Sequence, residues 1–386
     1  MKFIILMLLS CLIASCSSVK TSTIHQYSDV PKTTRGEVVS SSEYSAPVFI
    51  HNIKKIIYYQ YTTEGDTGSV VASSLILLPD KPNSKLVVLA HGTIGVDVAC
   101  SVDKTFPLFL HKGFINPLLK EGYTIVMPNY RGLGQTNATH FYFNAKESGK
   151  DLLDAILAAM KLQKIDIETP VVFLGYSQGG HAALSATEMR KSYFPQLNLV
   201  GLVLYAALVN FDEMINDILS KKISSTVQYF LLPYVVSPIV RSHSDIHYKD
   251  FFSSSAVPKD SGEDLVCLFD IVKMIPISNK WTLHPSDKAL EVAVSYYKEQ
   301  NLPHVRVDTP LMLIRGSKDA VIIDRWSKDY VTKLCSVGDV VEEVIYNGGH
   351  LSMAGVPRAV DWIRKRFNQE PPHNVCNTLS DKNNVQ

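Results

Sequence analysis

Short apolar runs alternate with segments of helical periodicity along most of this chain, and this alternation restricts its fold more than any other feature. The runs are rich in β-branched and aromatic residues, which is typical of strands. Strand patterns cover Ile53–Tyr61, Val70–Leu78, Leu86–Ala90, Tyr123–Met127, Val171–Leu174, Leu199–Tyr205, Leu311–Arg315 and Val340–Tyr346. Helical patterns cover Lys146–Lys164, Gly180–Tyr193, Ile323–Leu334 and Val356–Phe367. This alternation predicts a mostly parallel sheet with helices on both faces, preceded by an antiparallel pair made of the first two strand patterns.

Residues 210–308 interrupt the alternation, because they are far too long for an ordinary connection between two strands. The segment is mainly helical in pattern and contains recurring apolar patches, for example over Leu265–Ile277. We interpret it as a helical cap inserted over the carboxyl edge of the sheet, while residues 46–209 and 309–386 form the α/β core. Most apolar residues of such a cap are expected to pack against one another rather than against a substrate.

The N-terminus has the composition of an export signal. A positive residue is followed by the apolar run Phe3–Leu9 and then by small residues, which predicts a signal peptide over residues 1–15 rather than a buried helix. The end of this run, Ile13-Ala14-Ser15-Cys16, resembles a bacterial lipobox, which implies cleavage before Cys16 and attachment of lipid to that cysteine. Residues 16–45 are then expected to form a lipidated tether that holds the exported protein on the bacterial cell envelope.

Charge and cysteine content exclude several kinds of partner. The chain has 386 residues and a formal net charge of +1, and it contains no basic run, so a nucleic-acid partner is not expected. Beyond the N-terminus no apolar stretch is long enough for a transmembrane helix. The spacing of the remaining cysteines is unlike that of a zinc site, so two disulfides are favoured, with three pairings open. These cysteines are Cys100, Cys267, Cys335 and Cys376.

A serine lies between glycines directly after one of the strand patterns. The stretch Gly175-Tyr176-Ser177-Gln178-Gly179-Gly180 follows Val171–Leu174 and precedes a helical pattern. Serine and glycine are also common turn residues, so the bare pattern is weak. Between a strand and a helix, however, Gly-x-Ser-x-Gly is the nucleophile elbow, in which Gly175 and Gly179 leave room for a sharp turn that lifts the serine hydroxyl clear of the sheet. Ser177 is therefore the candidate nucleophile.

A serine nucleophile needs a base, and the base needs an acid that orients it; in this arrangement the acid and then the base follow the serine along the chain. His350 lies on a loop between a strand pattern and the last helical pattern, from which it can reach the elbow. Asp319 follows the strand pattern Leu311–Arg315, and its carboxylate would fix the imidazole tautomer. The alternatives, for which structural roles are simpler explanations, are Asp308 and Asp324 for the acid and His91 and His181 for the base.

The same chemistry requires an oxyanion hole. One donor is expected to be the backbone N–H of Gln178, the residue after the nucleophile. The other is expected from Thr93, in the loop His91-Gly92-Thr93 after the strand pattern Leu86–Ala90. The Thr93 hydroxyl could add a further bond to the developing negative charge.

Together these stretches resemble the secretory lipase family, of the lipase A type, within the α/β-hydrolase superfamily. The resemblance rests on Ala90–Gly95 followed by Cys100, and on Asn129–Gly134, Gly175–Gly180, Asp319 and His350. It covers roughly residues 50–367.

The resemblance implies an α/β-hydrolase fold and a serine esterase or lipase that acts on an ester or lipid small molecule without metal or cofactor. It also implies the disulfide pairs Cys100–Cys267 and Cys335–Cys376. Asn129 departs from the family pattern, in which an aspartate is usual before the tyrosine. The cap resembles the family least, and the cap sets specificity.

Two other functions fit parts of the same pattern. A peptidase of this fold would use the same three side chains, because the triad also suits amides. A surface lipoprotein that binds ligands without catalysis would need none of them. The presence of nucleophile, base, acid and the loop before Thr93 together favours the ester hydrolase.

Overall fold

The computed structural model of this protein describes residues 35–65, 68–134, 137–220, 222, 225–253, 267–268, 283–328 and 330–377. The predicted signal peptide, the predicted lipid site Cys16 and most of the predicted tether lie outside these residues. Within them, no helix is long and apolar enough to cross a membrane.

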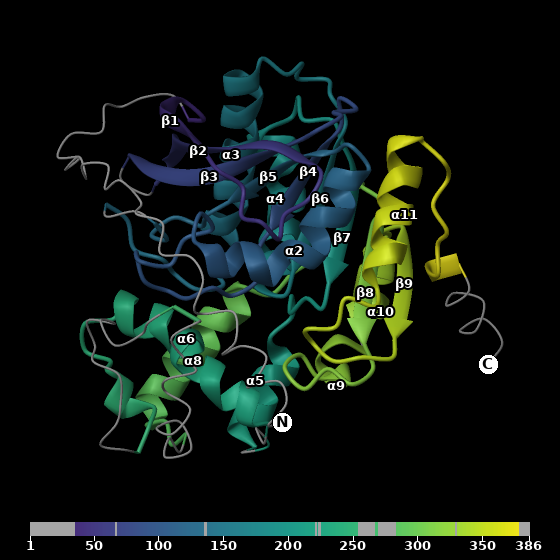
Figure 1. The fold of residues 1–386 in the computed structure, drawn as a ribbon. Coiled ribbons are helices and arrows are strands. Elements are labelled where there is room, and N and C mark those ends of the chain that lie inside the picture. Colours follow the sequence, from purple (N-terminus) through teal and green to yellow (C-terminus); the bar gives the residue numbers. More distant parts are fainter. Residues whose placement is uncertain are drawn as a thin grey trace. The chain divides into compact units, whose positions relative to one another are not determined.

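Nine strands in the described residues form one sheet, in the order β1-β2-β3-β5-β4-β6-β7-β8-β9 (Figure 1). The strands are β1 (Val38–Tyr44), β2 (Ile53–Glu64), β3 (Ser69–Pro79), β4 (Leu86–Ala90), β5 (Thr124–Pro128), β6 (Val171–Tyr176), β7 (Leu199–Tyr205), β8 (Leu311–Gly316) and β9 (Val341–Tyr346). The first three strands run antiparallel to their neighbours, and β4 to β9 are parallel to one another. This confirms the predicted mostly parallel sheet.

The first strand corrects the predicted tether. Val38–Tyr44 pairs with β2, so the tether expected over residues 16–45 is too long at its C-terminal end. The middle of β1 is polar and exposed. This is expected of an edge strand, because one of its two edges faces solvent. Its place in the sheet is fixed by backbone pairing with β2, which an apolar pattern cannot reveal.

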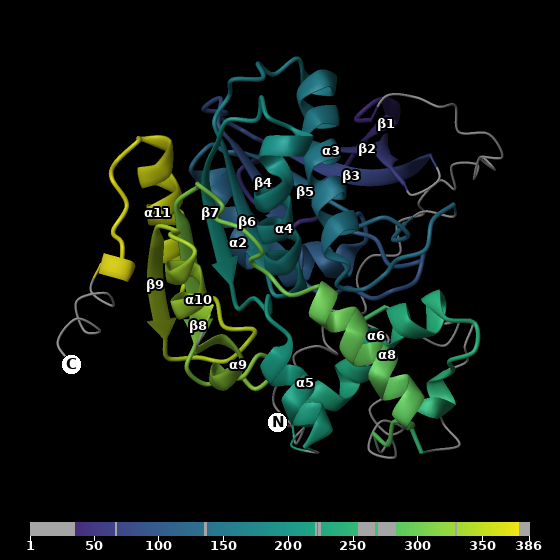
Figure 2. The ribbon, with the colours of Figure 1, turned by 180° about the vertical axis from the view of Figure 1, so that it is seen from behind.

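Helices cover both faces of the sheet, as predicted. On one face, α3 (Ala145–Gln163) and α4 (Gln178–Tyr193) pack against each other and against the central strands, and they lie in front of the sheet in Figure 2. On the other face lie α2 (Thr105–Lys120) and α11 (Val356–Phe367). Because both faces are covered, the inner strands are apolar along their whole length; every residue of β4, β5 and β6 is buried.

Helix α2 was not predicted from the sequence. It contains Pro107, Gly113 and Pro117, residues that usually mark the ends of helices. Pro107 lies in the first turn, where no intrahelical partner is lost, and Pro117 lies near the end. Burial of Leu108, Phe114 and their neighbours against the sheet outweighs the weak intrinsic preference for a helix.

The segment between β7 and β8 forms helices of its own. They are α5 (Asp212–Leu219), α6 (Thr226–Ser242), the short 3₁₀ helix η1 (Tyr248–Asp250) and α8 (Asp287–Glu299); α9 (Asp324–Lys328) and α10 (Tyr330–Ser336) follow β8. The inserted helices pack around a second apolar cluster, which includes Phe211, Tyr234 and Tyr297 and is distinct from the cluster around the sheet. Figure 1 shows these helices together beyond the carboxyl ends of β7 and β8.

The structure contains both disulfides that the family resemblance implied. Cys100, in the loop after β4, is joined to Cys267 in the inserted segment. Cys335 of α10 is joined to Cys376 near the C-terminal end of the described residues. The first bond therefore links the loop on the carboxyl side of the sheet to the inserted segment.

Candidate active site

Ser177 stands at the junction between β6 and α4. Its backbone has a φ of 54° and a ψ of −118°. Residues other than glycine rarely adopt this combination of backbone angles. The strain is held by neighbouring hydrogen bonds: the Ser177 N–H donates to Tyr205 O at 2.9 Å, and the Gly180 N–H donates to Ser177 O at 2.9 Å. The serine is 8% exposed. It lies on a buried turn and lines a cavity that is described below.

The flanking glycines are required by close backbone approach. A Cβ at Gly179 would lie 2.0 Å from Ala90 O, and a Cβ at Gly175 would lie 2.3 Å from Gly179 O. Atoms of a real protein do not approach this closely, so any side chain would push α4 away from β4 and β6. The predicted reason for both glycines is therefore confirmed.

Three side chains predicted from the sequence form one line of hydrogen bonds. His350 Nε2 lies 3.0 Å from Ser177 Oγ, and His350 Nδ1 lies 2.8 Å from Asp319 Oδ2. The other carboxylate oxygen, Asp319 Oδ1, accepts bonds from the N–H groups of Val321 and Ile322 at 2.8 and 2.9 Å. With its Nδ1–H directed at a carboxylate, the imidazole presents the Nε2 lone pair to the serine hydroxyl.

The alternative acids and bases are engaged elsewhere. Asp308 pairs with Lys191 and Arg306, and Asp324 pairs with Arg315. His181 Nε2 lies 2.8 Å from Gln300 O, and His91 Nδ1 lies 2.6 Å from Gly92 O. Burial lowers the pKa of His91 to about 3 and that of His181 to about 4, so neither imidazole is suited to accept a proton near neutral pH.

The loop after β4 is fixed by two residues that the sequence analysis did not single out. The Gly92 N–H donates to His111 Nε2 at 3.0 Å, while His111 Nδ1 lies 2.7 Å from Pro107 O. The hydroxyls of Thr93 and Tyr142 are 2.5 Å apart. His111 lies on α2, which the sequence did not predict, and no pattern of local spacing connects Tyr142 with Thr93.

Gln178 is anchored through its side chain. Gln178 Nε2 lies 3.3 Å from His140 Nε2, and His140 Nδ1 lies 3.2 Å from Arg131 O. Because the amide nitrogen donates, His140 Nε2 accepts and its Nδ1–H faces the carbonyl. This neutral tautomer agrees with the pKa of His140, which burial lowers to about 3.

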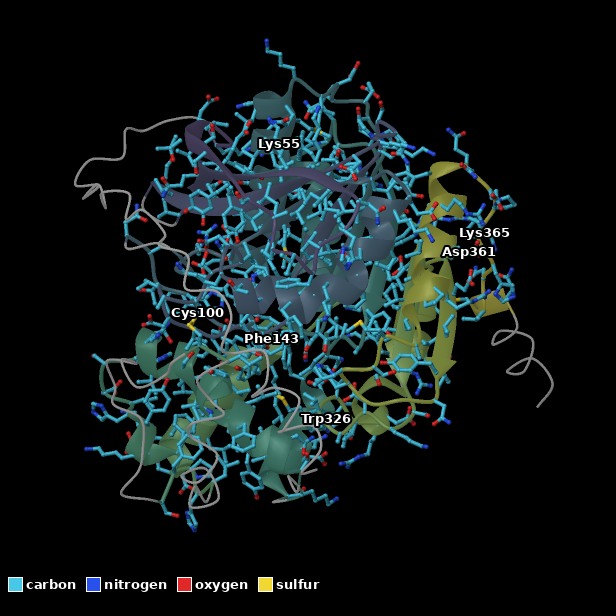
Figure 3. All side chains as sticks on the ribbon, viewed as in Figure 1. Lys55, Cys100, Phe143, Trp326, Asp361 and Lys365 are labelled. Atoms are coloured by element: carbon cyan, nitrogen blue, oxygen red, sulfur yellow. A yellow bond between two sulfur atoms is a disulfide. The ribbon has the colours of Figure 1, made fainter. Side chains whose placement is uncertain are left out.

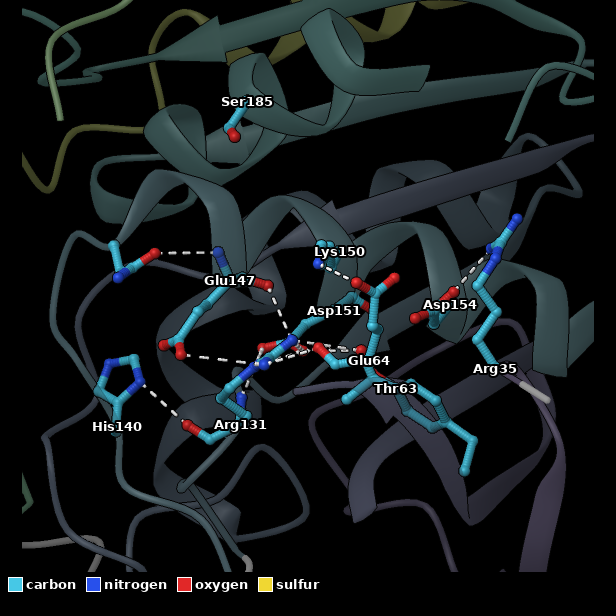
Figure 4. Close-up of polar contacts among 12 residues, drawn as sticks. Arg35, Thr63, Glu64, Arg131, His140, Glu147, Lys150, Asp151, Asp154 and Ser185 are labelled. Carbon is cyan, nitrogen blue, oxygen red and sulfur yellow. Dashed lines mark hydrogen bonds and ion pairs between the residues drawn. The ribbon is translucent and has the colours of Figure 1, made fainter. Parts of the chain in front are cut away.

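A buried ionic network holds the loop that carries Arg131 (Figure 4). Arg131 Nη2 donates to Asp151 Oδ1 at 2.8 Å, and the Arg131 N–H donates to Asp151 Oδ2 at 2.7 Å. Lys150, the residue before Asp151 on the same helix, α3, donates to Glu64 at 2.7 Å. The network ties α3 to β2 and to the loop after β5, and so indirectly holds His140 beside Gln178.

Asn129, which departs from the family pattern, is fully buried and well partnered. Its Nδ2 donates to Ser73 Oγ at 2.8 Å and to Ser101 Oγ at 2.9 Å, and its Oδ1 accepts from the Val102 N–H at 2.9 Å. An amide provides both donors and the acceptor that this position uses, whereas a carboxylate provides acceptors only. The Ser101 hydroxyl donates its own hydrogen to Asp103, so its oxygen can only accept from residue 129, which an amide satisfies and a carboxylate does not.

Ser177 lies in the wall of an apolar cavity of about 50 Å³. Phe143 and Trp326, labelled in Figure 3, line the same cavity from the α/β core. The inserted segment closes it with Met214, Ile218, Gln228, Leu231, Leu232 and Val235; Tyr142, Leu208, Val321 and Ile322 complete the wall. A wall of this composition suits a hydrocarbon chain next to the serine.

Fold and site together define an α/β-hydrolase. The profile of the secretory lipase family matches residues 100–375, so the chain belongs to that family. It is therefore a hydrolase of the lipase and esterase class, and the family is a secretory one, in agreement with the predicted export. The family resemblance seen in the sequence is confirmed.

Individual relatives are distant but cover most of the chain. Lipase 6 of Candida albicans is 24% identical over an alignment of 393 positions, gaps included, that covers 92% of this chain and 81% of that protein. Lipase A of Arthroderma benhamiae is 22% identical over 362 residues, which span 86% and 74% of the two chains.

Two solved structures share the fold. Lipase A of Candida antarctica in its closed state has a TM-score of 0.74 at 18% identity and covers 89% of this chain and 84% of its own. The rice cell wall degrading esterase LipA of Xanthomonas oryzae, in a ligand-bound form, has a TM-score of 0.70 at 17% identity and covers 88% and 100%. The predicted fold class is thereby confirmed.

Proposed function

We propose that this protein is a membrane-anchored serine hydrolase that cleaves carboxylic esters through an acyl-enzyme. The observation that carries the proposal is the line of hydrogen bonds from Asp319 through His350 to Ser177, next to an apolar cavity. The hydroxyl is within reach of a base, and the base is oriented by a carboxylate, which are the two requirements for activating a serine.

The chemistry follows from this order of groups. His350 Nε2 takes the proton from Ser177 Oγ as that oxygen attacks the ester carbonyl carbon, and Asp319 stabilises the imidazolium that forms. Collapse of the tetrahedral intermediate breaks the bond to the alcohol, which leaves with the proton from His350. Water then attacks the acyl group on Ser177, with His350 as base, and the carboxylic acid is released.

Two groups are suited to stabilise the oxyanion. Gln178 is the first residue of α4, so its N–H has no acceptor within the helix. Thr93 offers its N–H and its hydroxyl, which lies 2.5 Å from the Tyr142 hydroxyl; when the phenol donates in this pair, the threonine hydrogen is left for the oxyanion. Losing one donor of an oxyanion hole typically costs about 2.7–4 kcal/mol of transition-state stabilisation.

The inserted segment, residues 210–308, acts in this proposal as a cap. Its residues Met214, Leu232 and Val235 face Ser177 across the cavity, so it supplies much of the surface that an acyl chain would contact. The core then consists of residues 46–209 and 309–386, with β1 added to it at the N-terminal side.

The test compares two serines of the same region. Ser177→Ala is expected to lower kcat for a p-nitrophenyl ester by about 10⁴-fold or more and to abolish labelling by a fluorophosphonate probe. Ser185→Ala is the matched control, because Ser185 is also buried, lies on α4 and donates its hydroxyl hydrogen to Ala145 O at 2.6 Å. Full turnover by the Ser177→Ala protein, folded as judged by circular dichroism, would disprove the proposal.

The same assay separates the two alternatives. Wild-type protein is given short-chain esters, long-chain esters, and peptides that end in proline or alanine. Faster turnover of the peptides would identify a peptidase, and wild-type protein inert to the fluorophosphonate would identify a binding lipoprotein. Family membership favours the esters.

The membrane anchor is a separate part of the proposal and rests on the sequence Ile13-Ala14-Ser15-Cys16. Lipid on Cys16 would hold the exported enzyme on the cell envelope. Mass spectrometry of the mature protein should find an N-terminal cysteine with added acyl mass; an unmodified Cys16 would refute the anchor and leave the catalytic proposal intact.

A further inference from the structure

Three parallel strands of the sheet end in a tyrosine. Tyr176 is the last residue of β6, Tyr205 of β7 and Tyr346 of β9. All three side chains are buried. Because parallel strands finish at the same edge of a sheet, the three phenols gather where Ser177 and His350 also lie.

Each hydroxyl bonds the backbone of the loop that carries His350. Tyr176 donates to His350 O at 3.0 Å, and Tyr346 donates to Gly349 O at 3.2 Å. Tyr205 donates to Ser352 O at 2.7 Å and accepts from the Gly355 N–H at 3.1 Å. The loop is thus held over residues 349–355 by side chains that come from three different strands.

The rings of these tyrosines form a continuous wall behind the imidazole. The Tyr176 ring lies 5.4 Å from the His350 ring, and the Tyr205 ring lies 6.1 Å from Tyr176 and 5.6 Å from Tyr346. Phe114 of α2 packs against Tyr176 and Tyr205, with ring centroids 5.4 and 5.0 Å apart. A phenol has only two side-chain torsions, so such a wall is rigid at little entropic cost.

Backbone bonds also hold the loop: the Lys318 N–H donates to Gly348 O and the Ser352 N–H donates to Gly349 O, both at 3.0 Å. Leu351, the residue after His350, is 68% exposed, and Gly348 and Gly349 precede the histidine. Glycine-rich backbone is conformationally free unless it is bonded. These backbone bonds leave the His350 carbonyl to the Tyr176 hydroxyl, so the position of His350 Nε2 relative to Ser177 Oγ depends also on the bonds from the tyrosines.

We propose that Tyr176, Tyr205 and Tyr346 are positioning residues that hold the imidazole of His350 at hydrogen-bond distance from Ser177. The inference rests on the proposed function, in which His350 is the base. The tyrosines act through the loop backbone and need not touch the substrate, so their loss lowers the rate of the chemical step and leaves substrate binding largely unchanged.

The experiment removes each hydroxyl and keeps each ring. Tyr176→Phe, Tyr205→Phe and Tyr346→Phe are each expected to lower kcat for a p-nitrophenyl ester about two- to tenfold, with KM within about twofold of the parent. Labelling of Ser177 by a fluorophosphonate should slow in parallel. The triple variant should lose more, and the single variants keep the test decisive if the triple variant does not fold.

Tyr59→Phe is the matched control. Tyr59 is a fully buried strand tyrosine whose hydroxyl donates to a backbone carbonyl, Ala155 O, at 2.8 Å, but on β2. Loss of the Tyr59 hydroxyl should lower the midpoint of urea unfolding as much as each of the three test variants does. The kcat and the rate of fluorophosphonate labelling should stay at parent values.

Two outcomes separate this inference from the proposed function. If His350→Ala abolishes turnover but the three tyrosine variants match Tyr59→Phe in kcat, the positioning role is wrong and the triad stands. If His350→Ala keeps the parent kcat, both the proposed function and this inference fail.

Discussion

At the scale of residues, burial sets the protonation of the histidines around the serine-bearing turn. It lowers the pKa of His91 and His140 to about 3 and of His111 and His181 to about 4. For His111 the hydrogen bonds require the same state, because Nε2 accepts from the Gly92 N–H. A proton on Nε2 would break this bond and release the loop that carries Thr93.

Stability should therefore fall as the solution becomes acidic. A histidine with a folded pKa near 3 or 4 and an unfolded pKa near 6.5 takes up its proton first in the unfolded chain. The contribution of such a neutral, buried histidine to the free energy of unfolding is complete above about pH 6.5. It is lost as the pH falls toward 4, by up to about 1.4 kcal/mol per pH unit for each histidine. Urea midpoints at pH 7, 6 and 5 measure the effect.

The variant His181→Gln isolates one histidine, since a glutamine amide can still donate to Gln300 O. Burial raises the pKa of Asp154 and Asp339, and such carboxyls change stability with pH in the opposite direction. The comparison of variant with parent cancels them: the variant should show a shallower loss between pH 6.5 and 4. An unchanged slope would mean that His181 is not neutral in the folded state.

At the scale of elements, the unit formed by β6, the turn at Ser177 and α4 is held by close backbone contacts. Backbone contact between α4 and β4 leaves no room at Gly179, and the positive φ of Ser177 is maintained by one bond to β7 and one from α4. The sequence predicted this unit because strand, glycines and helix are neighbours in the chain. It could not predict α2, whose prolines argue against a helix and whose stability comes from packing on the sheet.

Two helical glycines give a matched test of this constraint. Gly179→Ala is expected to lower the free energy of unfolding by at least about 3 kcal/mol, because the new Cβ would meet Ala90 O at 2.0 Å. Gly113→Ala on α2 should change the free energy of unfolding by less than about 1 kcal/mol, because the atoms nearest to its Cβ would belong to the flexible Met353 side chain. Urea unfolding of both variants decides; equal effects would contradict the close approach of α4 to β4.

At the scale of the whole molecule, the second apolar cluster combines residues of the inserted segment with residues of the α/β core, and residues of both regions line the cavity at Ser177. The disulfide Cys100–Cys267 spans 167 residues and links the two regions, whereas Cys335–Cys376 spans 41 residues within the core. A crosslink that closes a longer loop removes more entropy from the unfolded chain.

Replacing each pair by serine should therefore have unequal effects. The double variant Cys100→Ser/Cys267→Ser is expected to lose about 1 kcal/mol more stability than Cys335→Ser/Cys376→Ser on chain entropy alone. Unfolding of the two proteins in urea under identical conditions measures the difference. A larger loss from the shorter loop would show that native contacts, rather than loop length, govern these crosslinks.

The amino-acid sequence by itself determined the features that neighbouring residues encode. The apolar runs gave the inner strands of a parallel sheet, and the glycines around Ser177 gave the turn. Because parallel strands end at one edge, it also predicted that Asp319 and His350 would lie near that serine, and the structure brings the three together.

Only the tertiary structure decided which distant residues support them. Four kinds of contact join segments that are far apart in the chain. They are the pairing of β1 with β2, the bond from the Gly92 N–H to His111, the contact of Tyr142 with Thr93, and the bonds from Tyr176 and Tyr205 to the loop of His350. Such contacts leave no local periodicity or spacing, because their geometry exists only after the sheet has formed and its edges have met the helices and loops that cover them.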